Sequence, residues 1–306
     1  MSLYLRRRLL LTVPVLLGVS TLVFLFVHLI PGDPVEVMLG EQALATDKEA
    51  LRRNLGLDRP LHLQYVGFIK GLLTGTLGRS LFTDEPVGET LLRHLGPTAL
   101  LAGASLLIAL AFALPLGILA ALRQGSLLDR GAILLALTGV AIPNFVLGPL
   151  LILAFSIGLG WTPVSGAEGP SHLILPALTL GTAMAGILSR MIRSSLLETL
   201  GEEYLRTARA KGLPERAVIL RHALRTSLIP VITVVGLQAG GLLSGALITE
   251  TIFAWPGLGR LTIQAINSRD YPLVQGAVLF IALGYVAVNL VTDLLYARAD
   301  PRIRLR

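Results

Sequence analysis

Six stretches of about twenty mostly apolar residues divide the chain, a pattern typical of a bundle of membrane-spanning helices. A helix needs about 20 such residues to cross the hydrocarbon core, because it rises only about 1.5 Å per residue. With 53% hydrophobic and 15% charged residues, the chain is too apolar for an ordinary soluble domain. We therefore expect an all-α membrane protein, with spans at Leu9–Ile30, Thr98–Leu122, Gly131–Leu159, Leu173–Met191, Leu228–Phe253 and Leu273–Leu295.

The distribution of basic residues predicts how these spans are oriented, because Lys and Arg concentrate in cytoplasmic loops. With a cytoplasmic N-terminus, 17 of the 26 Lys and Arg residues fall on the cytoplasmic side, whereas the short outer loops hold only Arg260 and Arg269. The first span is followed by "HLIPGDP" and not by a small-residue cleavage site, which favours a retained anchor. Both termini are predicted to be cytoplasmic. The net charge of +7 follows from this bias and is no argument for nucleic-acid binding.

The segment 31–97 lies outside the membrane in this topology and carries two helical patterns. In "TDKEALRRNLG", Thr46 is a predicted N-cap with Glu49 as its capping-box partner, and Gly56 is the predicted stop. After Pro60, apolar residues recur at helical spacing between Leu61 and Leu72. Two readings stay open: an outer platform that meets a soluble partner, or a solvated spacer with two helices lying at the interface.

Signatures of catalysis and metal binding are missing from the sequence. The patterns H-E-x-x-H, G-x-S-x-G and G-x-x-x-x-G-K-[ST] do not occur, the five His residues have no ligand spacing, and there is no Cys. We predict no catalytic residue, no metal site and no cofactor site. The chain is not expected to be an enzyme.

Proline and small residues mark the spans. Prolines that permit bends fall inside spans or near their starts, at Pro115, Pro143, Pro149, Pro176 and Pro230. In the fifth span, "GLQAG" (Gly236–Gly240) and "GLLSG" (Gly241–Gly245) let helices approach closely, and ordinary packing is favoured over a specific dimer face. The ionisable residues Glu250 and Asp293 lie near span ends, which weakens the case for an ion-driven carrier.

The stretch "EEYLRTARAKGLPERAVILRHALR" (Glu202–Arg225), which we call the basic hairpin, interrupts this apolar pattern. Gly212 is predicted to end a first short helix, and Pro214 suits the first turn of a second that continues into the fifth span. Helices this short need a packing partner. The small face formed by Ala208 and Gly212 favours close contact with a partner protein; the alternative is a simple basic cytoplasmic loop.

The chain resembles the membrane permease subunits of bacterial ATP-binding-cassette importers, in the dipeptide, oligopeptide, nickel and glutathione group. The family's cytoplasmic signature is Glu-Ala-Ala, three residues, Gly, nine residues, then Ile-x-Leu-Pro. Aligned on Gly212, only Ala208, Gly212 and Leu224 fit it, whereas "EEYLRTARAKGL" followed by "HALRTSLIPV" matches the peptide branch. Arg206, Thr207, His222 and Arg225 are the departures, and Thr76 stands where the family usually has Asp. The other matches include "LGRS", "ETIFAWPGLGRL" and "RDYPLVQG", and the resemblance covers essentially all 306 residues.

The resemblance implies a type I importer permease in the bacterial cytoplasmic (inner) membrane, with six spans, an outer helical segment and cytoplasmic coupling helices. The expected partners are a second homologous permease in a heterodimer, two ATPase subunits that bind the ATP, and an extracytoplasmic binding protein. The expected ATPase-coupling residues are Glu203, Tyr204, Arg206, Thr207, Ala208, Arg209, Ala210, Lys211, Gly212 and Leu213.

The outer turn after the fifth span is a second candidate site. Glu250, Trp255, Pro256 and Gly257 could help to close an outer gate; a simple loop with Trp255 as an interface anchor is the alternative. Peptides lead as the substrate, with nickel chelates and glutathione open, and residues that contact substrate are not predicted. The competing function is a self-sufficient channel or an ion-coupled carrier.

The expected organisation is a tail with the first span (1–30), the outer segment (31–97), a permease core (98–295) with its coupling loop at 192–227, and a cytoplasmic tail (296–306).

Overall fold

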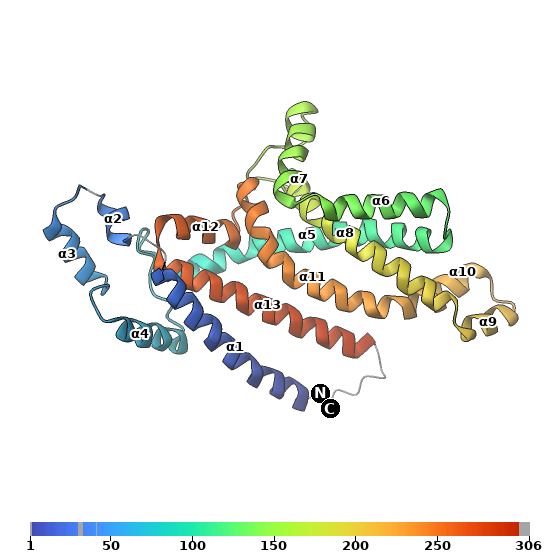
Figure 1. Ribbon diagram of the computed structural model, residues 1–306, viewed down its shortest axis with the longest axis horizontal. Coiled ribbons are helices and arrows are strands. Elements are labelled where there is room, and N and C mark those ends of the chain that lie inside the picture. Colours follow the sequence, from blue (N-terminus) through green and yellow to red (C-terminus); the bar gives the residue numbers. More distant parts are fainter. Residues whose placement is uncertain (1, 30–32, 41, 300–306) are drawn as a thin grey trace. The chain divides into compact units, whose positions relative to one another are not determined.

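The computed structural model describes residues 2–29, 33–40 and 42–299, and within these ranges it contains helices and no β-strand (Figure 1). This confirms the all-α prediction. Two segments are wound as π-helices, η1 (Ile152–Gly158) and η2 (Val218–Ala223). The α-helices are α1 (Ser2–Leu29), α2 (Pro34–Leu39), α3 (Ala45–Asn54), α4 (Leu61–Thr74), α5 (Val87–Leu122), α6 (Leu127–Ala141), α7 (Asn144–Leu151), α8 (Ser171–Leu200), α9 (Glu203–Ala210), α10 (Glu215–Ala217), α11 (Leu224–Ile252), α12 (Leu258–Ser268) and α13 (Tyr271–Ala299).

Five of the six predicted spans correspond to continuous apolar helices. The segments that are long and apolar enough to cross a membrane are Leu10–Leu29, Val87–Leu122, Ser171–Leu200, Glu215–Leu242 and Tyr271–Leu294. The helix at the second span begins eleven residues earlier than its predicted apolar stretch, and the helix at the fourth span continues to Leu200. Helices therefore extend beyond the apolar stretches that reveal them.

The third predicted span, Gly131–Leu159, is not one continuous helix. α6 ends at Ala141, and the segment Asn144–Gly158 leaves it at an angle of 102°. Pro143 caps the second piece, and Ile142 before it is extended (ψ 114°), because a residue that precedes proline is disfavoured in the helical conformation. The two pieces together can still count as a sixth, broken span.

The outer segment forms the two expected helices with a different start. α3 begins at Ala45 after Leu44, so Thr46 already lies inside the helix and is not its N-cap. Glu49 does not close a capping box but accepts a hydrogen bond from Arg53 one turn later, with Arg53 Nη2 3.4 Å from Glu49 Oε2. Gly56, at φ +68°, ends the helix as predicted, and α4 covers the predicted pattern from Leu61 to Leu72.

The chain packs into two compact units that do not follow its linear order. One holds the described residues up to Thr98 together with Pro256–Gly284, and the other holds Ala99–Trp255 with the described residues from Tyr285 onward. The core of the first unit joins α1, α5, α12 and α13 through Val23, Val27, Val87, Leu91, Leu258, Leu261 and Val274. The sequence did not indicate that 256–284 packs with the N-terminal segments.

Within the second unit, α8 is the central helix and packs against α5, α6 and α11 (Figure 1). Small residues permit these contacts. A methyl group at Gly186 would overlap the carbonyl oxygen of Ala136 on α6, and one at Gly181 would lie 2.9 Å from the Ser105 carbonyl oxygen on α5. The small residues Ala177, Gly181 and Ala185 are spaced four apart, a signal that the sequence analysis did not use.

The glycines of α11 also serve helix packing inside this unit. A methyl group at Gly236 would overlap the Thr292 side chain, and one at Gly240 would lie 2.8 Å from the Tyr285 ring, both on α13. Nothing lies within 4 Å of the corresponding position at Gly241. The favoured reading of ordinary packing is confirmed for Gly236 and Gly240, whereas the side-chain surroundings of 243–245, which include Gly245, lie outside the described residues.

Candidate functional site

The basic hairpin forms the two short helices that the sequence predicts. α9 ends at Ala210, and Gly212 follows with φ +79°, a left-handed conformation that glycine adopts without steric cost. Pro214 is the N-cap of α10, which continues through the π-helical η2 into α11 without a break. The two helices are therefore joined by a tight turn, and the second is covalently continuous with a spanning segment.

A small apolar core anchors the hairpin to the rest of its unit. Leu205 and Ala208 point inward from α9, and the residues that complete the cluster come from three other elements: Ala121 of α5, Leu196 of α8, and Val218 and Ala223 of η2. Leu205 is fully buried and Ala208 is 9% exposed. The expectation that the Ala208 side chain forms part of a free docking face was therefore wrong, because that side of α9 packs on this chain.

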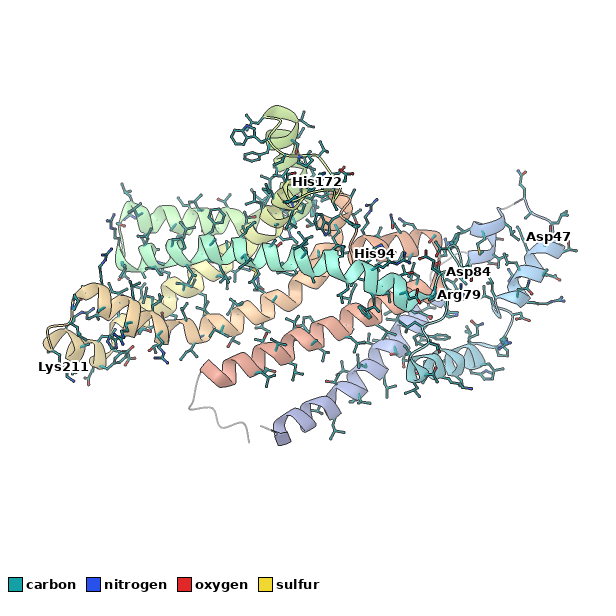
Figure 2. All side chains as sticks on the ribbon, turned by 180° about the vertical axis from the view of Figure 1, so that it is seen from behind. Asp47, Arg79, Asp84, His94, His172 and Lys211 are labelled. Atoms are coloured by element: carbon teal, nitrogen blue, oxygen red, sulfur yellow. The ribbon has the colours of Figure 1, made fainter. Side chains whose placement is uncertain are left out.

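The remaining predicted coupling residues are exposed. They are Glu203, Tyr204, Arg206, Thr207, Arg209, Ala210, Lys211, Gly212 and Leu213. Lys211 lies at the tip of the hairpin in Figure 2. Nothing lies within 4 Å of a methyl group placed on Gly212, so no other part of the chain packs against this turn, and its close contact with a partner stays a prediction. The surface combines positive charge with the half-exposed side chains of Tyr204 and Leu213.

Polar contacts close the hairpin. Arg209 donates two hydrogen bonds to the Glu215 carboxylate, from Nε to Oε2 at 3.1 Å and from Nη2 to Oε1 at 2.9 Å. This interaction raises the pKa of the Arg209 guanidinium above its usual value. Tyr204 Oη donates to Thr226 Oγ1 at 3.2 Å, which connects α9 to the start of α11. Glu215 was not among the predicted site residues, although an acid just beyond the Gly-Leu-Pro turn could have indicated this pairing.

Two further contacts connect α8, which precedes the hairpin, to its neighbours. Arg193 forms a bidentate ion pair with the buried Asp129 at the start of α6, at 2.6 and 2.8 Å. Ser195 Oγ donates to the Ser227 carbonyl oxygen of α11 at 2.8 Å. These contacts join α8 to α6 and to α11 beside the hairpin, and no sequence pattern indicated them.

The outer turn after α11 differs from its predicted form. The helix ends at Ile252, and Ala254 takes a left-handed conformation (φ +51°), after which the Trp255 N–H donates to the Glu250 carbonyl oxygen at 2.8 Å. Trp255 is only 3% exposed and belongs to the core of the second unit. The alternative role of Trp255 as an interface anchor was wrong, because the reversal of the backbone directs its ring inward.

The other residues of the outer turn are placed as follows. Glu250 is completely buried, Pro256 is exposed, and Gly257 is the N-cap of α12. The expected tight turn is present. Closure of an outer gate by these residues stays a prediction.

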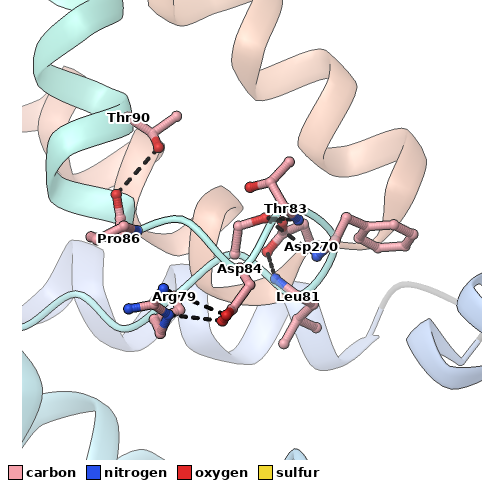
Figure 3. A network of polar contacts seen from close by, with 9 residues as sticks. Arg79, Leu81, Thr83, Asp84, Pro86, Thr90 and Asp270 are labelled. Atoms are coloured by element: carbon pink, nitrogen blue, oxygen red, sulfur yellow. Dashed lines mark hydrogen bonds and ion pairs between the residues drawn. The ribbon is translucent and has the colours of Figure 1, made fainter.

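A clasp in the first unit joins two of the motif segments (Figure 3). Asp270 is buried, accepts a hydrogen bond from the Ser80 hydroxyl and another from the Leu81 N–H (3.2 Å), and caps the start of α13 at the Leu273 N–H (3.3 Å). The loop is also closed by the ion pair of Arg79 and Asp84 at 2.8 Å. The residues "LGRS" and "RDYPLVQG" are thus in contact, a pairing that the sequence analysis did not predict.

Thr76, the departure from the family pattern, is exposed and interacts within its own loop. Its hydroxyl lies 2.8 Å from that of Thr74.

Comparison with known families gives two matches that together cover almost the whole chain. Residues 113–305 match the family described as "Binding-protein-dependent transport system inner membrane component". Residues 1–102 match the N-terminal region described for membrane components of the same transport systems.

Full-length relatives are similar over nearly all of both chains. The chain is 46% identical to the glutathione transport system permease protein GsiC of Salmonella typhimurium over 303 residues, covering 99% of each protein. It is also 46% identical to the di/tripeptide permease DppB of Pseudomonas aeruginosa and 44% identical to the dipeptide permease DppB of Escherichia coli K12, each over 98% of both chains.

Among solved structures, the inward-facing MetNI methionine ABC transporter has a chain with the same fold. The TM-score is 0.58 at 18% identity, over 71% of this chain and all of that one. The helices, the two matched regions and the full-length relatives agree. The chain therefore belongs to the inner-membrane permease components of binding-protein-dependent ABC importers, as a multi-pass membrane subunit that works with ATPase and binding-protein subunits.

Proposed function

We propose that this chain forms half of the translocation pathway of an importer for dipeptides, oligopeptides or glutathione. The similarity to permeases named for glutathione and for di- and tripeptides supports this substrate class, since it reaches 44–46% identity over nearly the full length. Nickel chelates remain a third candidate within the same group. The substrate is delivered by an extracytoplasmic binding protein.

The other half of the pathway is a homologous permease in a heterodimer, and both termini are cytoplasmic. The excess of Lys and Arg in the segments at Arg6–Arg8, Arg190–Arg225 and Arg298–Arg306 supports this orientation. ATP is bound by two partner subunits, and this chain carries no cofactor of its own. Its part in the ATP cycle is mechanical.

The exposed, anchored basic hairpin is the observation that carries the proposal. The solvent-exposed side of the hairpin presents Arg206, Lys211 and Leu213, which suit an ATPase surface with acidic and apolar groups. Its inner side is fixed by Leu205 and Ala208 in the apolar core shared with α5, α8 and η2. A surface that binds differently in the two nucleotide states of the ATPase would shift the connected helices between two arrangements.

Site-specific crosslinking tests the docking surface, and the absence of natural Cys makes single-Cys variants simple to interpret. A photo-crosslinker on Lys211→Cys, at the hairpin tip, should capture an ATPase subunit in native membranes. A crosslinker on Glu49→Cys, on the exposed outer helix α3, is the matched control and should not capture it. Absence of any ATPase adduct at position 211, with the intact complex present, would contradict the docking assignment.

Uptake into proteoliposomes tests the transport class and the substrate. The purified complex with its binding protein is offered labelled dipeptide, glutathione or nickel chelate. Uptake of one of these should require ATP hydrolysis and persist after ion gradients are dissipated. Uptake by this chain alone, abolished when the ion gradient collapses, would favour the competing ion-coupled carrier; ungated flux would favour a channel.

A further inference from the structure

The outer helix α4 packs beside the outer part of the first span. Thr21 Oγ1 on α1 lies 2.7 Å from Tyr65 Oη, and His28 Nε2 lies 3.2 Å from Gln64 Oε1. The Phe24 ring lies between these polar contacts, with its centroid 5.2 Å from that of Tyr65 and 5.8 Å from that of Phe68. One face of α4 is therefore fixed against about two turns of α1, from Thr21 to His28.

These contacts place α4 at a depth that the apolar span occupies. The apolar stretch of α1 runs from Leu10 to Leu29, and Thr21 lies eight residues before its end. At 1.5 Å per residue, the contact between Thr21 and Tyr65 is roughly 12 Å inward from that end. The Tyr65 side chain reaches this depth, whereas the neighbouring Gln64 contacts His28, one residue before the end of the apolar stretch. The helix α4 therefore lies beside the outer part of the hydrocarbon layer, because the span itself fills that layer.

The opposite face of α4 is exposed and carries three large apolar side chains, with His62, Lys70 and Thr74 in or beside the same sector. Leu63 is 51% exposed, Val66 60% and Leu73 82%. At 100° per residue these three lie within one sector of the helix, away from Tyr65 and Phe68. The exposed apolar side chains of α1 in the same turns, Leu22 and Leu25, lie on the face that adjoins its contact with α4. The apolar surface of the span thus continues onto α4.

We propose that α4 is embedded in the outer leaflet of the membrane, with Leu63, Val66 and Leu73 against lipid acyl chains. With 14 residues, α4 is too short to cross the bilayer and lies in one leaflet. Lys70 is exposed on the same face, and its long apolar stem allows the ammonium group to reach the headgroups. The neighbouring α3 is polar and carries the exposed pair Glu49 and Arg53, so it lies in water.

The two helices of the outer segment then lie in different environments, α4 in lipid and α3 in water. The side of the membrane on which α4 lies follows from the proposed orientation of the chain. The position of α4 in lipid depends on neither the transported substrate nor the ATPase contact. A negative quenching result would therefore leave the proposed transport function untouched, and a negative uptake or crosslinking result would leave the position of α4 untouched.

Single-Cys variants report the environment of α4 in the intact transport complex. Val66→Cys and Leu73→Cys are labelled with a nitrobenzoxadiazole fluorophore and reconstituted into phosphatidylethanolamine–phosphatidylglycerol vesicles that contain doxyl-labelled lipid. Leu25→Cys on the exposed face of α1 is the lipid-facing control, and Glu49→Cys on α3 is the aqueous control. None of these positions is buried, so the complex should fold in each variant.

The expected result is loss of most of the fluorescence at positions 66 and 73 with doxyl lipid, as at position 25, and little loss with aqueous iodide. A shallow doxyl group should quench them more strongly than one near the end of the acyl chain. Quenching by iodide equal to that at position 49 would overturn the proposal. Protection from iodide only after addition of the binding protein would also overturn it and identify α4 as a protein-docking surface.

Discussion

Replacement of Gly212 separates two reasons why this residue matters. Gly212 connects α9 and α10 with φ +79°, and an added methyl group meets no atom of this chain within 4 Å. A substitution therefore acts through backbone conformation, or through the surface of a docked ATPase. We expect Gly212→Val to abolish most ATP-coupled uptake while membrane insertion stays normal.

The magnitude follows from the left-handed conformation. An L-residue with a Cβ pays roughly 1–2 kcal/mol there, and a β-branched residue pays more. One to two kcal/mol reduces the population of the native turn roughly 5- to 30-fold relative to alternatives. Asn tolerates this conformation better than Ala, although Asn is larger. If conformation decides, retained uptake should follow the order Gly, Asn, Ala, Val.

Uptake rates are measured in proteoliposomes at matched amounts of complex, with co-purified ATPase quantified for each variant. If close seating against the ATPase decides, the smaller Ala should retain more uptake than Asn. That order would refute the conformational reasoning. Normal uptake by Gly212→Val would refute both reasons and remove Gly212 from the coupling site.

The other predictions concern packing, the outer clasp and the hairpin ion pair. Gly186→Ala should destabilise the detergent-solubilised protein by about 1–3 kcal/mol in thermal unfolding, because the methyl group overlaps a backbone oxygen of α6. The control Gly131→Ala, also within a helix but with open space around it, should stabilise the protein by about 0.5–1 kcal/mol. Equal effects of the two substitutions would contradict the packing of Gly186 against α6. Asp270→Ala leaves two backbone N–H groups without their carboxylate, which costs about 1–3 kcal/mol, and hydrogen exchange in residues 80–86 should accelerate; unchanged exchange would refute the clasp. Arg209→Glu should lower uptake, and combination with Glu215→Arg should restore it. This exposed ion pair contributes only about 0–1 kcal/mol to stability. If the double variant does not regain uptake, Arg209 contacts the ATPase itself.

The sequence predicted the helices well because the signals that define them are local. A backbone inside lipid must satisfy its hydrogen bonds within its own helix, so about 20 apolar residues in a row are enough to indicate a span. Gly212 and Pro214 likewise act on the two or three residues around them. Resemblance to the permease family added the function, because its motifs recur in the same order along the chain.

The tertiary structure decided which side of each helix packs inside the chain and which side stays exposed. In sequence, Ala208 is a small residue suited to close contact, and only the cluster with Leu196 and Val218 shows that this contact lies within the chain. Trp255 is an amphipathic residue suited to an interface, and only the backbone reversal at Ala254 places it in the core.

Contacts between distant residues were beyond the reach of the sequence for the same physical reason. Asp270 and Ser80 are 190 positions apart, and no periodicity or capping pattern connects two residues at that separation. Pro143 indicated an interruption of the third span, but proline permits both a kink and a complete break of a helix. Neighbouring helices decide between those outcomes, as they decide which apolar faces meet protein and which meet lipid. By itself, the sequence determined the helices and the turns between them; packing between distant segments determined how their surfaces are used.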